Sequence, residues 1–229
     1  MAKKTSPQNK SNQIYCTVRE EIVTGKYPGG TFLIEGELCE KFSVSRTPVR
    51  EALIRLAQDG FVELIPNRGA YIPHVTLSDI SEICQLRAAN EGLAAFLLAK
   101  NCPPSVLAKL EESVSKEEAM LDDPDTNPKD ISNEDFNFHI MVAKYCGNNR
   151  LADMLSLIEN QMKRFAFLSA DDHAVSGTLR TSVAAHRATV DAIRTGDADA
   201  ARDRLAEHWW AMLDGYFQRS LVGKLPLQL

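Results

Sequence analysis

The sequence predicts a mainly α-helical protein in two parts, an N-terminal winged helix-turn-helix over residues 10–75 and an all-helical antiparallel bundle over residues 77–222. Two short helical segments, separated by a two-residue break, are followed by a hairpin pattern. Beyond that hairpin, apolar residues recur at helical spacing and never alternate with period two. The net charge is +2 for residues 1–75, from 10 basic and 8 acidic residues, and −7 for the remainder, from 16 and 23. This charge asymmetry favours nucleic acid as the partner of the first part alone.

The segment VSRTPVREALIRLAQDG, residues 44–60, is a helix with both ends marked. Ser45 stands at the N-cap position, Pro48 lies in the first turn where its missing N–H costs little, and Gly60 stops the helix. The residues at positions i, i+3, i+4 and i+7 are apolar, so one face is expected to pack inward. They are Val49, Ala52, Leu53 and Leu56.

The leading end of this helix is polar and lies away from the apolar stripe. Ser45, Arg46, Thr47 and Arg50 gather there, which suits contacts to phosphates and base edges. The alternative is an ordinary solvated helix. However, arginine has the unfavourable sign at a helix N-terminus, so an anionic partner outside the helix is expected.

The neighbouring segments complete a winged helix-turn-helix. A helix is expected over residues 12–25 and a second, short one over residues 35–42, just before Ser45. Two apolar runs, residues 61–65 and 70–72, read as a hairpin with Arg68 and Gly69 at its tip. This tip would be the wing.

The remainder of the chain reads as helices joined by short loops. A linker over residues 73–76 leads into a helix over residues 77–100, and Pro103-Pro104 separates it from the next. A polar loop covers residues 122–130. Helices are then expected at about residues 131–145, 150–168, 179–195 and 197–220, which form an antiparallel bundle.

Three histidines in the bundle occupy core-side positions of their helices: His139, His186 and His208. Asp135 precedes His139 by four residues and so lies one turn away on nearly the same face. Each histidine alone could be a hydrogen-bonded core residue. Buried unpaired imidazoles and carboxylates are costly, and one divalent metal ion would satisfy all four side chains.

Other features bound the class of protein. The five cysteines show neither CxxC nor paired spacing, so no disulfide framework or thiolate zinc site is indicated. No signal peptide opens the chain and no apolar run reaches the length of a membrane span, so we expect a cytoplasmic protein without a membrane partner. Residues 1–9 are expected to be a disordered basic tail, and His74 and His173 are assigned no role.

The strings PGGTFLIEGEL, VSRTPVREALIRLAQDGFV and PNRGAYI resemble the DNA-binding domain of GntR-family transcription regulators. The resemblance continues through the helical part, which is similar to the FadR-type subfamily with its FCD effector domain. It implies that Arg46, Thr47, Arg50 and Gly69 contact operator DNA. Where family members often carry an arginine between two acidic residues, this chain has Gly36, so one expected DNA contact lacks its residue and the operator preference is expected to differ.

The FCD resemblance also implies a metal site, because Asp135, His139, His186 and His208 fill the family's four ligand positions. Three imidazoles and a carboxylate suit Zn²⁺, Ni²⁺, Mn²⁺ or Fe²⁺. The resemblance points to regulators of small carboxylic acids, and Arg87 is the candidate to hold the effector's carboxylate. An i,i+4 ion pair with Glu91 is the equal alternative for Arg87.

The leading functional hypothesis is therefore a ligand-responsive transcription regulator, a repressor that binds double-stranded operator DNA as a homodimer. The alternative is a metal-dependent hydrolase or oxygenase that uses the three histidines and Asp135. No additional inward acidic residue at a fixed offset offers itself as a general base. That expectation favours the regulator.

Overall fold

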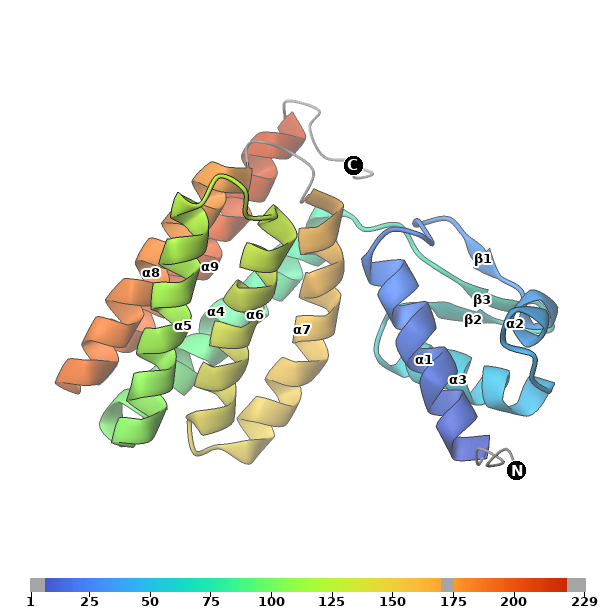
Figure 1. The fold of residues 1–229 in the computed structure, drawn as a ribbon, viewed down its shortest axis with the longest axis horizontal. Helices are drawn as coiled ribbons and strands as arrows, with labels where there is room; N and C mark the ends of the chain where they lie inside the picture. Colours follow the sequence, from blue (N-terminus) through green and yellow to red (C-terminus); the bar gives the residue numbers. More distant parts are fainter. Residues whose placement is uncertain (1–6, 170–174, 222–229) are drawn as a thin grey trace. The chain divides into compact units, whose positions relative to one another are not determined.

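The structure is a computed structural model that describes residues 7–169 and 175–221 (Figure 1). The described residues form nine α-helices and one three-stranded sheet, which confirms the mainly α class. The chain divides into two compact units between Val75 and Thr76. Residues 1–6 of the expected tail, His173 and residue 222 lie outside the described residues.

The N-terminal unit contains helices α1 (Pro7–Val23), α2 (Glu35–Phe42) and α3 (Arg46–Gln58). The first helix begins before its expected start at residue 12 and takes in part of the predicted tail. The tight turn between α2 and α3 depends on Ser43, whose backbone is left-handed with φ 51°. The N–H groups of Ser43 and Val44 donate to the carbonyls of Glu40 and Cys39, which ends α2 so that α3 can begin.

Helix α3 follows the sequence prediction closely. Ser45 occupies the N-cap position with an extended backbone, although its side chain makes no capping hydrogen bond. Gly60, with φ 75°, comes just after the helix ends. Helix α3 packs against α1, and the four apolar stripe residues are at most 1% exposed: Val49, Ala52, Leu53 and Leu56.

The small sheet has one more strand than the predicted hairpin. Strands β2 (Glu63–Ile65) and β3 (Gly69–Tyr71) form the hairpin, and β1 (Phe32–Leu33) pairs antiparallel with β3 on its other side. Gly69 allows this pairing, because a Cβ at that position would lie 2.1 Å from the carbonyl oxygen of Leu33. The sequence did not reveal β1 because a two-residue strand has no periodicity of its own.

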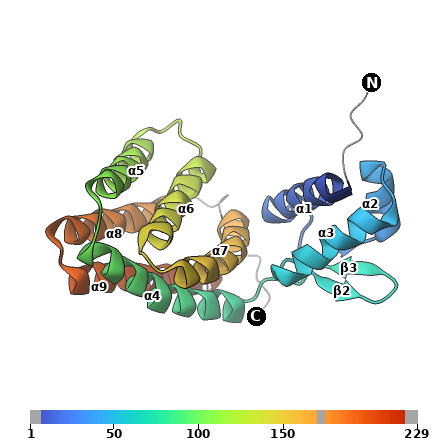
Figure 2. The ribbon, with the colours of Figure 1, turned by 90° about the horizontal axis from the view of Figure 1, so that it is seen from below.

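The second unit is built from six helices in the described residues (Figures 1 and 2). Thr76 and Asp79 form a capping box at the start of the first of them. The third of them begins at Pro128, inside the polar loop predicted over residues 122–130, because the side chain of Asn127 caps it by accepting from the N–H of Lys129 at 2.9 Å. The helices are α4 (Leu77–Lys100), α5 (Pro104–Asp122), α6 (Pro128–Tyr145), α7 (Asn149–Ser169), α8 (Val175–Thr195) and α9 (Ala198–Leu221).

Helices α4 and α9 form the most extensive helix pair of this unit and lie alongside each other in both ribbon views. Gly92 permits their close approach, since an added Cβ would lie 3.2 Å from the carbonyl oxygen of Arg202. Helix α4 also contacts α6, α7 and α8, so the core of the unit surrounds its inner face. Among the described residues no helix combines the length and apolar content that a bilayer span requires.

Candidate functional site

The leading end of α3 presents its polar side chains outward. Ser45, Arg46, Thr47 and Arg50 are all exposed, as a nucleic-acid-binding surface requires. The Nε of Arg50 donates to both carboxylate oxygens of Glu35, at 2.9 and 3.0 Å. A contact between Arg50 and DNA therefore requires that Arg50 leave Glu35.

The two wing residues differ in their surroundings. Arg68 is exposed in the turn between β2 and β3 and makes no ion pair with the residues that the structure describes. Gly69 is buried against Leu33 and has φ 117°. This strand contact accounts for glycine at position 69 without any contact to DNA.

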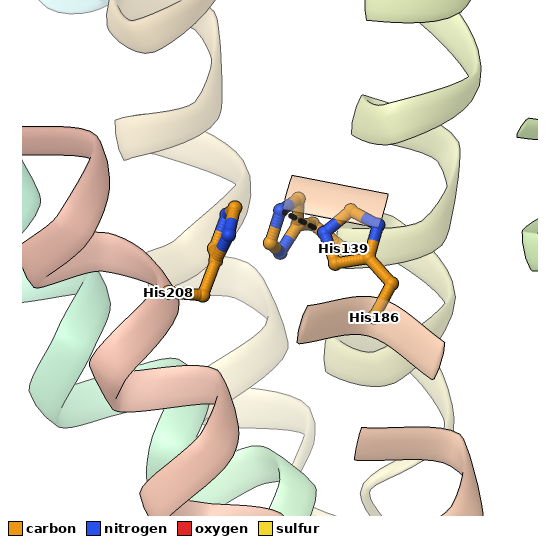
Figure 3. A group of neighbouring side chains, drawn as sticks. All are labelled: His139, His186 and His208. Carbon is orange, nitrogen blue, oxygen red and sulfur yellow. Dashed lines mark hydrogen bonds between the residues drawn. The ribbon is translucent and has the colours of Figure 1, made fainter. Parts of the chain in front are cut away.

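A cluster of three histidines lies in the core of the helical unit. His139 comes from α6, His186 from α8 and His208 from α9, and their side chains converge (Figure 3). They are 2%, 0% and 4% exposed, which confirms the prediction that each lies on the core side of its helix. The ring centroids lie 4.8–5.0 Å apart, and at least one nitrogen of each ring lies within 4.8 Å of the others.

Asp135 lies beside two of these rings. Its carboxylate oxygens are 3.8 Å from the Nε2 atoms of both His139 and His186. The hydroxyl of Ser182 donates to Asp135 at 2.5 Å and holds the carboxylate in place. The four residues proposed from the sequence as metal ligands thus lie together in one buried cluster.

Two further buried carboxylates face the outer nitrogens of the histidines. Glu91 lies 2.5 Å from Nδ1 of His139, and Glu117 lies 3.0 Å from Nδ1 of His186. The expectation that no additional acidic residue points inward is therefore wrong. Glu117 continues the buried stripe of α5, with Leu110 and Val114 before it, so that stripe could have identified it.

These carboxylates determine which ring nitrogen carries the proton. Glu91 and Glu117 accept hydrogen bonds, so Nδ1 of His139 and of His186 is the donor. The lone pairs then belong to the two Nε2 atoms, which face each other at 3.2 Å, along the dashed line of Figure 3. Two lone pairs repel at this distance, so a proton or a cation is needed between them.

Burial shifts the ionisation of the cluster. It lowers the pKa of His139 and of His208 well below the ordinary value, which keeps both rings neutral and able to bind a metal. Burial also raises the pKa of Glu117. For His186, burial alone would lower the pKa, but the charge and hydrogen bond of Glu117 outweigh it and raise that pKa.

Arg87 adjoins the cluster through Glu91. Its NH2 lies 2.6 Å from a Glu91 oxygen, and its guanidinium stacks on the ring of Trp209 at 4.1 Å. The i,i+4 pair considered from the sequence therefore forms. The Nε and NH1 of Arg87 are buried and find no hydrogen-bond partner among the described residues. Arg87, Glu91 and His139 line a cavity of about 360 Å³, along with residues of α6 and α7 that include Lys144 and Asn149.

Family comparisons identify the two units. The model for bacterial regulatory proteins of the gntR family matches residues 10–72, and the FCD domain model matches residues 82–210. The chain belongs to the GntR family, with an FCD domain. It is therefore a transcription regulator with a GntR DNA-binding domain rather than an enzyme, and the hydrolase or oxygenase alternative is not supported.

Curated relatives of this GntR regulator span nearly the same length. The chain is 27% identical to the HTH-type transcriptional repressor RspR of Escherichia coli, and the match covers 89% of this chain and 86% of RspR. It is 28% identical to the galactonate operon transcriptional repressor of Escherichia coli over 84% and 90%.

Solved structures share the fold. Escherichia coli McbR/YncC superposes with a TM-score of 0.73 at 22% identity, covering 92% of this chain and 98% of that one. A GntR regulator from Rhodococcus sp. RHA1 superposes with a TM-score of 0.72 at 22% identity, covering 91% and 97%.

Proposed function

We propose that this GntR regulator is a repressor that senses a small carboxylic acid at a divalent metal ion. Asp135, His139, His186 and His208 would hold the ion. Two of these ligands would be fixed by Glu91 and Glu117 through their Nδ1 atoms, as outer carboxylates do in metal sites generally. When bound, an ion such as Zn²⁺, Ni²⁺, Mn²⁺ or Fe²⁺ supplies Lewis-acid positions for a carboxylate.

The observation that carries this proposal is the charge of the cluster. Glu91, Glu117 and Asp135 are at most 6% exposed, and Arg87 is the buried cation beside them. In the protonation states that metal binding requires, with neutral imidazoles and ionised carboxylates, these side chains carry a formal charge of −2. Uncompensated buried charge is costly, and a divalent ion held by these side chains would balance it.

A second observation supports metal rather than a shared proton. The Nε2 of His208 is buried and has no hydrogen-bond partner among the described residues. A proton between His139 and His186 would leave that atom unsatisfied, whereas a metal ion can accept all three imidazoles at once. The donor set therefore fits a transition-metal ion better than it fits hydrogen bonding alone.

The cavity supports an anionic effector of small size. It extends from His139 to Arg87, whose free Nε–H and NH1 donors suit a carboxylate. The galactonate operon repressor among the relatives is named for a hydroxy acid operon, which is consistent with this chemistry. Arg87 would bind the acid while Glu91 holds the guanidinium in position.

The DNA-binding part of the proposal assigns operator contacts to the N-terminal unit. Two copies of α3 in a homodimer would enter successive major grooves of a pseudo-palindromic operator. Base and phosphate contacts would come from the exposed leading end of α3 and from the wing. The proposed residues are Ser45, Arg46, Thr47, Arg50, Arg68 and Gly69.

The test is His186→Ala with His74→Ala as control, since His74 is exposed and lies in the other unit. We expect His186→Ala to lose the bound metal by elemental analysis and the acid response by calorimetry, with operator binding retained in a gel-shift assay. The His74→Ala control should keep all three. A parent protein without a stoichiometric divalent ion, or a His186→Ala variant that keeps metal and effector, would overturn the proposal.

A further inference from the structure

The two arginines at the leading end of α3 differ in their partners. Arg46 and Arg50 lie about one helical turn apart and are both exposed. Arg46 forms no ion pair with the residues that the structure describes, whereas Arg50 is paired with Glu35, the first residue of α2. The side chain of Arg50 is 59% exposed and that of Glu35 is 23% exposed. One arginine is therefore free to bind an anion, and the other already has a carboxylate beside it.

The fold holds Glu35 next to Arg50 through contacts at both ends of α2. The turn between α2 and α3 is closed by Ser43, with its left-handed backbone, so the two helices keep their positions. Strand β1 pairs with β3 just before α2 begins, and the backbone nitrogen of Glu35 lies 3.3 Å from the position that a Cβ at Gly69 would take. The ion pair thus joins two segments whose backbones are fixed by other contacts.

Glu35 neutralises the charge of Arg50 in the free protein. The Nε of Arg50 donates to both carboxylate oxygens, and this contact raises the pKa of Arg50. Glu35 is the acidic residue behind this shift, although Glu37 and Glu51 flank the pair in the sequence. A phosphate that approaches Arg50 therefore meets a carboxylate with a charge of the same sign as its own, and the two anions repel.

Guanine and phosphate differ in how strongly this carboxylate opposes them. The O6 and N7 atoms of guanine are uncharged acceptors that an arginine binds with two hydrogen bonds. A phosphate is an anion, and its contact with arginine carries no sequence information. Because Glu35 remains nearby after Arg50 leaves it, the carboxylate repels a phosphate more than it repels a guanine edge. We propose that Glu35 is a specificity-determining residue, which withholds Arg50 from phosphates and releases it to a guanine of the operator.

This assignment gives the two arginines separate tasks. Arg46, without a carboxylate partner, supplies affinity for any DNA, while Arg50 adds affinity where the base sequence offers a guanine. The inference rests on the proposed role of α3 as the recognition helix. It adds that an acidic residue outside α3 controls how well operator DNA is distinguished from other DNA.

The test is Glu35→Gln in the full-length chain, since glutamine keeps the shape and one acceptor oxygen but removes the charge. The probes are a duplex that the parent protein selects from a random-sequence pool and a duplex with the same bases in shuffled order. A surface ion pair is weak, so the variant should bind the shuffled duplex roughly two- to fivefold more tightly, with a smaller change for the selected duplex. The slope of log affinity against log salt for the shuffled duplex should steepen by about one unit, for one added phosphate contact.

Glu37→Gln is the matched control, because Glu37 is exposed, lies in the same first turn of α2 and forms no ion pair with the described residues. It removes the same charge and should leave the ratio of the two affinities unchanged. Two double variants locate the effect. Glu35→Gln should have no effect when Arg50 is already replaced by alanine, and should keep its full effect when Arg46 is replaced instead.

Three results would each disprove this role of Glu35. They are a Glu35→Gln variant that binds the shuffled duplex no more tightly than the parent, an equal loss of discrimination in Glu37→Gln, and an effect of Glu35→Gln that persists without Arg50. Failure of the proposed recognition helix gives a different result, because Arg50→Ala would then bind the selected duplex as tightly as the parent.

Discussion

Replacing Glu117 by glutamine tests whether this buried carboxylate supports the metal ligand His186. Both Glu117 oxygens lie near Nδ1 of His186, at 3.0 and 3.2 Å, and Glu117 is 0% exposed. Glutamine has the same shape and keeps one oxygen acceptor for that N–H, but it removes the negative charge. The variant therefore changes the electrostatics of the site and leaves its packing nearly intact.

The expected magnitude follows from two considerations. A hydrogen bond to a charged group contributes about 1.5–3 kcal/mol and a neutral one about 0.5–1.5 kcal/mol, so the difference is about 1–1.5 kcal/mol. Loss of attraction between the carboxylate and a divalent ion adds to this, and losses at such outer residues amount to roughly 10- to 100-fold in metal affinity. We therefore expect a metal dissociation constant at least roughly tenfold higher.

The assay is metal competition against a chromogenic chelator, with thermal unfolding measured in parallel. In excess chelator the Glu117→Gln variant should unfold close to the parent temperature, because removing the desolvation cost of the buried charge and its repulsion from Asp135 offsets the weaker interaction with His186. With metal present, the variant should be the less stable protein. A loss of stability that appears only when metal is present separates a role in metal binding from a general structural role.

Glu118→Gln is the matched control, since it is the same substitution one residue along α5. Glu118 faces outward, pairs with Arg187 at 2.6 Å and has a side chain that is 44% exposed. Its replacement should leave the metal affinity unchanged. If Glu117→Gln binds metal as tightly as the parent, or if Glu118→Gln weakens binding equally, the reasoning about the buried cluster is refuted.

Three further predictions concern DNA binding, the wing and the metal. Arg50→Ala should weaken operator binding by roughly 5- to 150-fold, measured by fluorescence anisotropy at fixed salt, whereas the control Arg204→Ala on α9 should bind like the parent. If Arg50→Ala binds the operator as tightly as the parent protein, α3 is not the recognition helix. Gly69→Ala should destabilise the N-terminal unit by at least about 1–3 kcal/mol, because the backbone of Gly69 has a φ of 117° and an added Cβ would clash with Leu33. The control Gly36→Ala, whose added Cβ meets nothing within 4 Å, should raise the stability by up to about 1 kcal/mol. Similar melting temperatures for the two variants would contradict this account. Removing the metal with a chelator should lower the melting temperature of the helical unit and leave operator binding intact. If the free metal was at 100 times its dissociation constant, the lost stability corresponds to about 2.7 kcal/mol. An unchanged melting curve would contradict a bound ion.

Local sequence signals predicted α3 well. Its start after Ser45, its stop at Gly60 and its buried stripe all depend on residues within a few positions of each other, and the structure has each of them, although the Ser45 side chain makes no capping hydrogen bond. The same is true of the inward histidines, because helical periodicity fixes which side of a helix a residue occupies. Asp135 and His139 share a face for the same reason.

Contacts between distant segments were less visible. Strand β1 exists because Phe32 and Leu33 pair with β3, almost forty residues later in the chain, and nothing in two residues announces this. The ion pair between Arg50 and Glu35 joins α3 to α2 across the turn, so the exposed Arg50 must leave Glu35 before it can contact DNA. Position 69 likewise requires glycine because a Cβ there would clash with the backbone carbonyl of Leu33 on another strand.

The sequence by itself determined the helices, the inward faces of the histidines and the family resemblance, because caps, periodicity and motifs are properties of neighbouring residues. Only the tertiary structure decided that Glu91 and Glu117 face the Nδ1 atoms of His139 and His186, across sequence separations of 48 and 69 residues. Periodicity can place a carboxylate on an inner face, but the packing of α4, α5, α6 and α8 chooses its partner. That choice orients the two Nε2 atoms toward each other and concentrates the buried negative charge.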